Sequence, residues 1–352
     1  MEKTQTVPPD QRHVVADGDA PQPRATRRLL SFALGLVVSV FFLYLALRGV
    51  NAGQLRRELQ AARFTLLILA VAVGSITCII RAVRWRILLG KRQQATLRPL
   101  FTSMMIGYLA NNLLPARAGE LVRIYVLERR TGMSKSTSAA TVILERLTDA
   151  LVLLALIGVL SFFVPLPALI RDGSRIAAAG CFVVALFLLY IAARGHKLAY
   201  RLTHRVEAIS PKIGQKLEKL FLLFADGLGV LRSGRHLISV LTLTLLVWAI
   251  EAVSVTLVIS SLGLSLPRIA AVFILVVISL SALIPTAPGA VGTYEFFTVA
   301  ALTPFAVGGN RAVGLALALH AVNYVTVTLL GVLSLSAESL SWRELTGNTR
   351  NP

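Results

Sequence analysis

The stretch YLANNLLPARAGELVRIYVLERRTGMSKSTSAATVILERLTD, Tyr108–Asp149, decides the fold of this chain. It begins inside an uncharged apolar run, residues 99–116, and then meets Arg117, Gly119 and Glu120 in quick succession. This pattern predicts a membrane segment that stops being helical part of the way through. Backbone N–H and C=O groups outside a helix stay unbonded in hydrocarbon unless protein or a wet cavity surrounds them. The break therefore predicts a functional site within the membrane.

The composition indicates a multi-pass membrane protein. The 352 residues are 55% hydrophobic and 15% charged, with a mean hydropathy of +0.72, which gives too many long apolar runs for one soluble core. The net charge is +19, and the Lys and Arg residues lie between apolar runs. There they can orient the chain in the membrane and contact anionic lipid headgroups, so we expect no nucleic-acid partner. Cys78 and Cys181 both lie in apolar runs, which argues against a disulfide framework or a cysteine metal site.

The order of the apolar runs predicts the organisation of the chain. Residues 1–28 are polar and rich in proline, so we expect a disordered cytoplasmic tail there. Residues 29–340 are expected to form the transmembrane domain, and residues 341–352 a C-terminal tail. Within the domain, apolar residues recur every three or four positions in the polar segment 194–236. This segment predicts amphipathic helices that lie on the cytoplasmic face or pack on the bundle.

Basic residues predict the topology. The apolar span 64–80 continues into Arg81, Arg84 and Trp85, and we expect the arginines to snorkel while Trp85 sits at the membrane interface. This end is then cytoplasmic, and the loop 48–63 lies outside. Both chain termini are expected in the cytoplasm, and the arginine-rich composition favours a bacterial plasma membrane.

Two re-entrant hairpins are predicted. If residues 99–116 crossed the membrane, the basic connection that follows would lie outside, against the positive-inside rule. A hairpin with arms near residues 97–114 and 118–130 that enters from the cytoplasm avoids this conflict. A second hairpin, entering from outside, is predicted at IPTAPGAVGTYE, Ile284–Glu295, because its prolines and glycines disfavour a continuous helix.

The expected fold is all-α: a bundle of six full spans plus two opposed re-entrant hairpins, about eight hydrophobic segments in all. A shift of 173 residues places Pro115 and Gly119 over Pro288 and Gly292, one pair in each hairpin. Paired segments interrupted by glycine and proline in corresponding halves are typical of inverted-repeat transporters, and they point to the binding site.

Three motifs resemble those of a known family. NNLLPARAGELVR begins at Asn111, ILERLTD begins at Ile143 and PTAPGAVGTYE begins at Pro285. In this order they resemble the transmembrane region of lysylphosphatidylglycerol synthases and their stand-alone flippase-like relatives, over residues 29–340. The resemblance implies movement of a lipid between leaflets. About a dozen residues follow Leu340, so no aminoacyltransferase domain is expected and the resemblance does not imply lysyl transfer.

The candidate substrate site gathers the polar residues of both broken segments. Arg117 and Arg123 are permanently charged donors suited to a lipid phosphate, although Arg117 could instead pair with Glu120. Half-helices that begin near Gly119 and Gly292 would present backbone N–H groups to the same anion. The candidate residues are Asn111, Asn112, Arg117, Gly119, Glu120, Arg123, Glu145, Arg146, Asp149, Pro288, Gly289, Gly292 and Glu295.

Two interpretations are open for Glu145 and Asp149, which lie four residues apart on one helix face. As unpaired neighbours in a low dielectric they would retain a proton, which suits proton coupling. As counter-ions they would pair with Arg117, Arg123 or Arg146. His320 is expected to be a hydrogen-bonded packing residue, and no metal site or cofactor is predicted.

The sequence therefore favours a lipid translocase over an enzyme, with membrane lipids of anionic headgroup as its partners. The first alternative is a membrane transferase that acts on a lipid phosphate, with Glu120, Glu145 or Asp149 as base. The second is a membrane anchor that holds a separately encoded synthase or glycosyltransferase through the segment 194–236. The chain is compatible with an oligomer.

Overall fold

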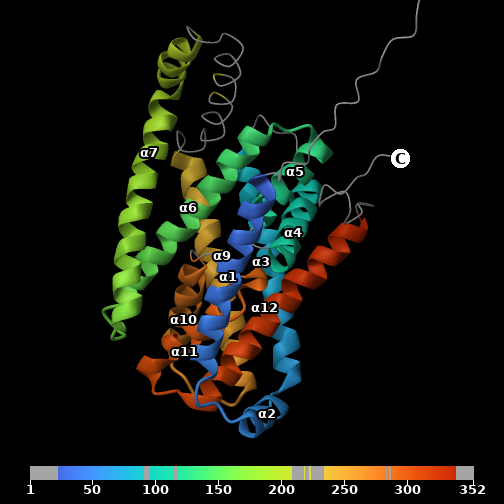
Figure 1. The fold of residues 1–352 in the computed structure, drawn as a ribbon, viewed down its shortest axis with the longest axis vertical. Coiled ribbons are helices and arrows are strands. Elements are labelled where there is room, and N and C mark those ends of the chain that lie inside the picture. The colour runs from blue at the N-terminus through green and yellow to red at the C-terminus, as the bar shows by residue number, and fades with distance from the viewer. Residues whose placement is uncertain are drawn as a thin grey trace, which may run out of the picture.

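The computed structural model describes residues 23–90, 96–114, 118–207, 218, 222, 234–282, 284 and 287–337, and these residues form helices and no strand. Figure 1 shows an elongated bundle in which most helices run along the long axis. The helices are α1 (Pro23–Leu47), α2 (Ala52–Gln60), α3 (Phe64–Leu89), α4 (Leu97–Leu113), α5 (Gly119–Thr131), α6 (Lys135–Leu160), α7 (Ala168–Glu207), α9 (Gly234–Ser261), α10 (Arg268–Ser281), η3 (Pro288–Ala290), α11 (Thr293–Leu302), η4 (Thr303–Phe305) and α12 (Gly309–Ala337).

Long apolar helices in the described residues agree with a membrane protein. Three of them, α3, α9 and α12, are long and apolar enough to cross a bilayer. The count rises to four if α1 and α2, which are bent by 85° at the break between them, are taken as one span. α6 is also 26 residues long, about 39 Å at 1.5 Å per residue, but it carries the charged residues described below.

The centre of the bundle is formed by α3, α9 and α12. Gly74 on α3 faces the side chains of Ser254 on α9 and Thr326 on α12, where an added Cβ would lie 3.6 to 4.0 Å from their atoms. Ser254 donates a hydrogen bond of 3.0 Å to the carbonyl oxygen of Ala70. Small and hydroxylated residues therefore bring these helices together, as is common where helices pack in membranes.

α4 and α5 are two closely packed helices at the place of the first predicted hairpin. Gly107 and Gly119 allow the close approach, because a Cβ added at Gly119 would lie 1.9 Å from the carbonyl oxygen of Gly107. The helices part at Leu114 and resume at Gly119, as the sequence predicts. α4 also packs closely on α12, where a Cβ at Gly331 would lie 2.6 Å from the Cβ of Leu109.

α10 and α11, with η3 between them, lie at the place of the second predicted hairpin. Gly292 precedes α11 with φ of +88°, a conformation that favours glycine. A Cβ there would lie 2.1 Å from the carbonyl oxygen of Ser39, so α1 lies directly against the tip of this hairpin. The two tips also meet, since a Cβ at Gly289 would lie 3.7 Å from the carbonyl oxygen of Asn112. Figure 1 shows α10 and α11 at the end of the bundle near α2, and α5 toward the other end.

Helices occupy parts of three polar segments. α1 begins at Pro23, so residues 23–28 are helical, whereas the sequence assigns them to the tail. The loop 48–63 contains α2, which is capped by the side chain of Asn51. α7 continues through residues 194–207, so the first part of the polar segment is helical and continuous with the apolar helix before it. Most of residues 208–233, like residues 1–22 and 338–352, lie outside the described residues.

Candidate functional site

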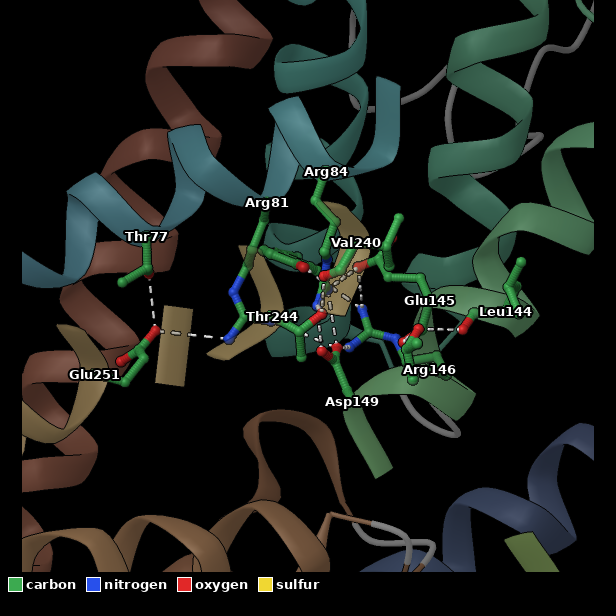
Figure 2. Close-up of polar contacts among 12 residues, drawn as sticks. Thr77, Arg81, Arg84, Leu144, Glu145, Arg146, Asp149, Val240, Thr244 and Glu251 are labelled. Atoms are coloured by element: carbon green, nitrogen blue, oxygen red, sulfur yellow. Dashed lines mark hydrogen bonds and ion pairs between the residues drawn. The ribbon is translucent and has the colours of Figure 1, made fainter. Parts of the chain in front are cut away.

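Eight charged side chains gather where α3, α5, α6 and α9 meet, and we call them the charge cluster (Figure 2). Four arginines and four carboxylates contribute, so their formal charges balance. Charges removed from water are tolerated when they are paired in this way. The members are Arg81, Arg84, Glu120, Arg123, Glu145, Arg146, Asp149 and Glu251.

Arg84 forms the buried centre of the cluster. Its side chain is fully buried and donates to both carboxylate oxygens of Asp149, in a bidentate contact whose longer arm is 3.1 Å. It also donates to the hydroxyl of Thr244 at 2.8 Å and to Glu145 at 3.3 Å. Such planar, bidentate contacts fix the geometry of both partners. Arg84 therefore links α3, α6 and α9.

Arg123 joins the first hairpin to this centre. Its guanidinium donates to Glu145 at 2.6 Å and to Glu120 at 3.4 Å, and the side chain is fully buried. It also lies over the ring of Trp85, with 4.0 Å between the guanidinium carbon and the ring centroid. Trp85 in turn donates to the hydroxyl of Thr141 at 3.1 Å. Arg123 thus holds α5 against α3 and α6.

The pair of Glu120 and Arg146 forms the open edge of the cluster. Their oxygen and nitrogen atoms are 2.9 Å apart, and the side chains are 26% and 41% exposed, whereas Arg84 and Arg123 are fully buried. The guanidinium of Arg146 also reaches the hydroxyl of Tyr108 at 3.5 Å. Arg146 lies eleven residues after Lys135, the first residue of α6, which is about 16 Å along the helix. The exposed charge therefore lies well inside a long helix, far from either end.

The cluster extends on its other side to Glu251 on α9. Arg81 lies 3.7 Å from Asp149 and 3.7 Å from Glu251, and Thr77 donates to Glu251 at 2.8 Å. Figure 2 shows this arm of the cluster pointing away from Arg146. Glu251, which is not among the candidate residues predicted from the sequence, is thus part of the network.

The expected snorkelling of Arg81 and Arg84 is wrong. Arg84 and Trp85 are completely buried, and the side chain of Arg81 is only 12% exposed. The signal for this was present in the sequence, because Thr77, Arg81 and Arg84 recur at four and three residues and so form a polar stripe on one helix face. The counter-ion interpretation of Glu145 and Asp149 is confirmed, since both pair with arginines, among them Arg84.

The N–H groups of Gly119 and Gly292, next to the two breaks, are already bonded within the protein. The N–H of Gly119 donates to the side-chain oxygen of Asn111 at 2.9 Å, and the N–H of Gly292 donates to Glu295 at 2.6 Å. The side-chain amide of Asn112 donates to Thr328 on α12 at 3.1 Å. These contacts close both tips. Pro288 opens η3, and Arg117 lies outside the described residues.

The second hairpin carries its own ionisable pair, which is separate from the charge cluster. One oxygen of Glu295 lies 2.5 Å from Nδ1 of His320 on α12, and Nε2 of His320 lies 2.8 Å from the carbonyl oxygen of Gly289. Tyr294 stacks on the imidazole with 4.5 Å between ring centroids. His320 therefore ties α12 to both ends of the second break. Within the described residues, no group of three or more His, Cys, Asp and Glu side chains is placed to hold a metal ion.

Comparison with known proteins gives a family match that covers most of the chain. The family model described as lysylphosphatidylglycerol synthase TM region matches residues 32–331. A UPF0104 membrane protein of Methanothermobacter thermautotrophicus is 27% identical over 77% of this chain and 86% of its own length. The UPF0104 membrane protein MJ1078 of Methanocaldococcus jannaschii is 26% identical over 63% of this chain and 91% of its length.

A third relative has a different name. The glycosyltransferase AglD of Haloferax volcanii is 27% identical over 91% of this chain, but the match covers only 56% of AglD. The part of AglD that this chain resembles is therefore little more than half of that protein. No solved structure matches the chain significantly.

Proposed function

The chain belongs to the lysylphosphatidylglycerol synthase TM region family, and on this premise we propose that it moves a lipid with an anionic headgroup between the leaflets of a plasma membrane. The lipid would be a phospholipid or a lipid linked to polyprenyl phosphate. The observation that carries the proposal is the ion pair of Glu120 and Arg146, the exposed edge of a buried and balanced charge cluster. Ionisable side chains inside membrane helices mark substrate pathways.

The open pair suggests how a phosphate is received. A phosphate that reaches Arg146 replaces the carboxylate of Glu120, because a guanidinium binds either anion through paired N–H donors. Glu120 then keeps its contact with Arg123, 3.4 Å away. In this proposal Arg117, which lies between α4 and α5 in the sequence, supplies a fifth cation that offsets the added phosphate charge. The acyl chains remain in the bilayer while the headgroup crosses.

We propose that the membrane topology is six full spans and two opposed re-entrant hairpins related as an inverted repeat, with both termini cytoplasmic. A correspondence in the structure supports this. Glu120 is the second residue of α5 and pairs with Arg146, eleven residues after the start of α6. Glu295 is the third residue of α11 and contacts His320, eleven residues after the start of α12. Matching broken segments in two halves are typical of transporters.

Transbilayer movement in liposomes that hold the purified protein tests the proposal. Fluorescent phosphatidylglycerol and a polyprenyl-phosphate lipid would be followed by accessibility to an external quencher. We expect Arg146→Gln and Arg117→Ala each to slow movement by at least about tenfold, since each removes a cation from the path. Arg311→Gln is the matched control, because Arg311 is also exposed and pairs with a glutamate, Glu58, outside the cluster.

Two results would count against this function. Movement that is equally fast in Arg146→Gln and in the control would remove Arg146 from the path. If neither lipid moves in liposomes that hold the folded protein, the translocase proposal fails.

A transferase acting on a lipid phosphate is the second candidate, favoured by the likeness to AglD over 91% of this chain. In that reaction one carboxylate of the cluster would act as base. Incubation with radiolabelled sugar or aminoacyl donors and the same lipids decides between the two, because a labelled lipid product would support the transferase. Co-purification of a synthase that is lost when residues 194–236 are deleted would support the anchoring role.

A further inference from the structure

Both ring nitrogens of His320 face hydrogen-bond acceptors. Nδ1 faces a carboxylate oxygen of Glu295 at 2.5 Å, and Nε2 faces the carbonyl oxygen of Gly289 at 2.8 Å. Both partners are acceptors, whereas a neutral imidazole has only one N–H to donate. Both contacts are hydrogen bonds only if the pair of Glu295 and His320 holds one proton beyond a carboxylate and a neutral imidazole.

The surroundings favour that extra proton. The pair is neutral overall when His320 is charged and Glu295 is ionised, so little net charge is buried. Tyr294 stacks on the imidazole at 4.5 Å, and an aromatic face attracts a cation. Tyr324 approaches edge-on at 6.2 Å, and no arginine or lysine is recorded against the pair among the described residues.

Other titratable groups nearby are accounted for. Glu251 on α9 acts electrostatically on Tyr294, but it is itself 3.7 Å from Arg81. α1 contributes the hydroxyl of Ser39, which accepts from the N–H of Ala287 at 3.0 Å. The protonation of this pair therefore depends mainly on Glu295 and His320 themselves.

We propose that Glu295 and His320 form a proton-binding site whose proton holds the tip of the second hairpin against α12, and that release of the proton frees the tip for lipid movement. When the proton leaves, His320 keeps one N–H, which the charged oxygen of Glu295 attracts more strongly than a carbonyl does. The bond from Nε2 to Gly289 breaks, and two lone pairs then face one another across 2.8 Å. The tip at Gly289, which lies against Asn112 of the first hairpin, is released.

The link to lipid movement rests on the translocase function proposed above, but the proton site does not. Nitrogen-15 NMR of histidine-labelled protein in nanodiscs tests the site directly, with the His320 signals assigned by their loss in His320→Gln. We expect both ring nitrogens to carry protons near pH 7, or one to do so while infrared spectra show a protonated carboxyl group that disappears in Glu295→Gln. The decisive spectra are recorded at a pH below about 6.5, the usual pKa of histidine. If His320 carries a single ring proton there while Glu295 is ionised, the proposal is overturned.

Lipid movement supplies the second measurement. In the liposome assay we expect the rate to rise at least about threefold between about pH 6 and about pH 9, because deprotonation frees the tip. In His320→Gln the profile should be flat, and in His236→Gln it should keep the shape of the unaltered protein. If lipid moves and His320→Gln keeps the same pH profile, the coupling is wrong. If no lipid moves at any pH, the translocase function fails while the proton site is still decided by the spectra.

Discussion

The two hairpins are built alike but are held by different cations. In each, a glutamate in the first turn of the second helix contacts a basic residue eleven residues into the next long helix. The first hairpin is held by Arg123 and Arg146, which are charged at every accessible pH, while the second is held by His320. The difference suggests a division of roles, in which the first hairpin provides a fixed cationic site and the second responds to protons.

The largest effect is expected where the fixed site is broken at its centre. Glu145→Ala leaves Arg84 and Arg123, both fully buried, without the carboxylate that they share. Uncompensated buried charge destabilises a protein by about 3–5 kcal/mol, so we expect a large fall in the melting temperature in nanodiscs. Glu128→Ala is the control, because Glu128 pairs with Lys135 at an exposed site and should change stability by less than about 1 kcal/mol. Equal effects of the two substitutions would show that the cluster does not hold the first hairpin.

The next largest effect tests the tight packing of both tips. At Gly292, a methyl group would meet the backbone of α1 at 2.1 Å and φ is +88°, so Gly292→Ala combines overpacking with backbone strain and should destabilise by about 2–4 kcal/mol. At Gly119, a methyl group would meet the carbonyl oxygen of Gly107 at 1.9 Å and the side-chain oxygen of Asn111 at 2.5 Å, but φ is not positive there. Gly119→Ala therefore adds overpacking without backbone strain and should destabilise by about 1–3 kcal/mol. Thermal unfolding measures both.

Gly158→Ala serves as the control for these substitutions, since nothing lies within 4 Å of its added Cβ. It should leave the melting temperature unchanged or raise it slightly, because alanine favours a helix over glycine. If Gly119→Ala were more harmful than Gly292→Ala, the second tip would be less constrained by α1 than the structure indicates.

The sequence predicted the breaks because proline and glycine act locally, but it did not predict the partners across the breaks. The helix ends near Leu114 and Ser281 follow from the residues on either side of them. The burial of Arg84 depends on Asp149 and Thr244, which lie 65 and 160 residues away. The hydropathy of α3 does not decide whether its arginines are exposed at the end of a span or buried in the bundle. That depends on which face of α3 the other helices cover.

The pair of Glu295 and His320 was missed for a different reason. The shift of 173 residues that aligns Pro115 with Pro288 places Arg146 over Leu319, one residue before His320. A comparison of letters at a fixed shift therefore finds no basic residue there. The structural correspondence survives because each cation keeps its distance from the start of its helix, and this distance is visible only once the helix bounds are known.

The third prediction concerns the kind of cation, permanent or titratable, that distinguishes the two hairpins. Arg146→His replaces a permanent cation by a titratable one against Glu120, so the first hairpin should also become sensitive to pH. In the liposome assay we expect movement by this variant, relative to the unaltered protein at the same pH, to fall severalfold as the pH rises above about 6.5, where a histidine loses its charge. Arg146→Lys keeps the charge and should remain insensitive at this site. A pH profile unchanged in Arg146→His would mean that the charge at Arg146 is not required.

The smallest effect concerns the two asparagines that close the first tip. Asn111 accepts from the N–H of Gly119, and Asn112 donates to Thr328 on α12, each in one hydrogen bond near 3 Å. Loss of one such bond changes the free energy of unfolding by about 1 kcal/mol, so Asn111→Ala and Asn112→Ala should be similar in stability. They should differ in transport, because Asn111→Ala frees a donor within the first hairpin while Asn112→Ala loosens that hairpin from α12. Faster lipid movement in Asn112→Ala alone would indicate that the hairpin moves as one unit against α12, whereas faster movement in Asn111→Ala alone would indicate that its tip unwinds.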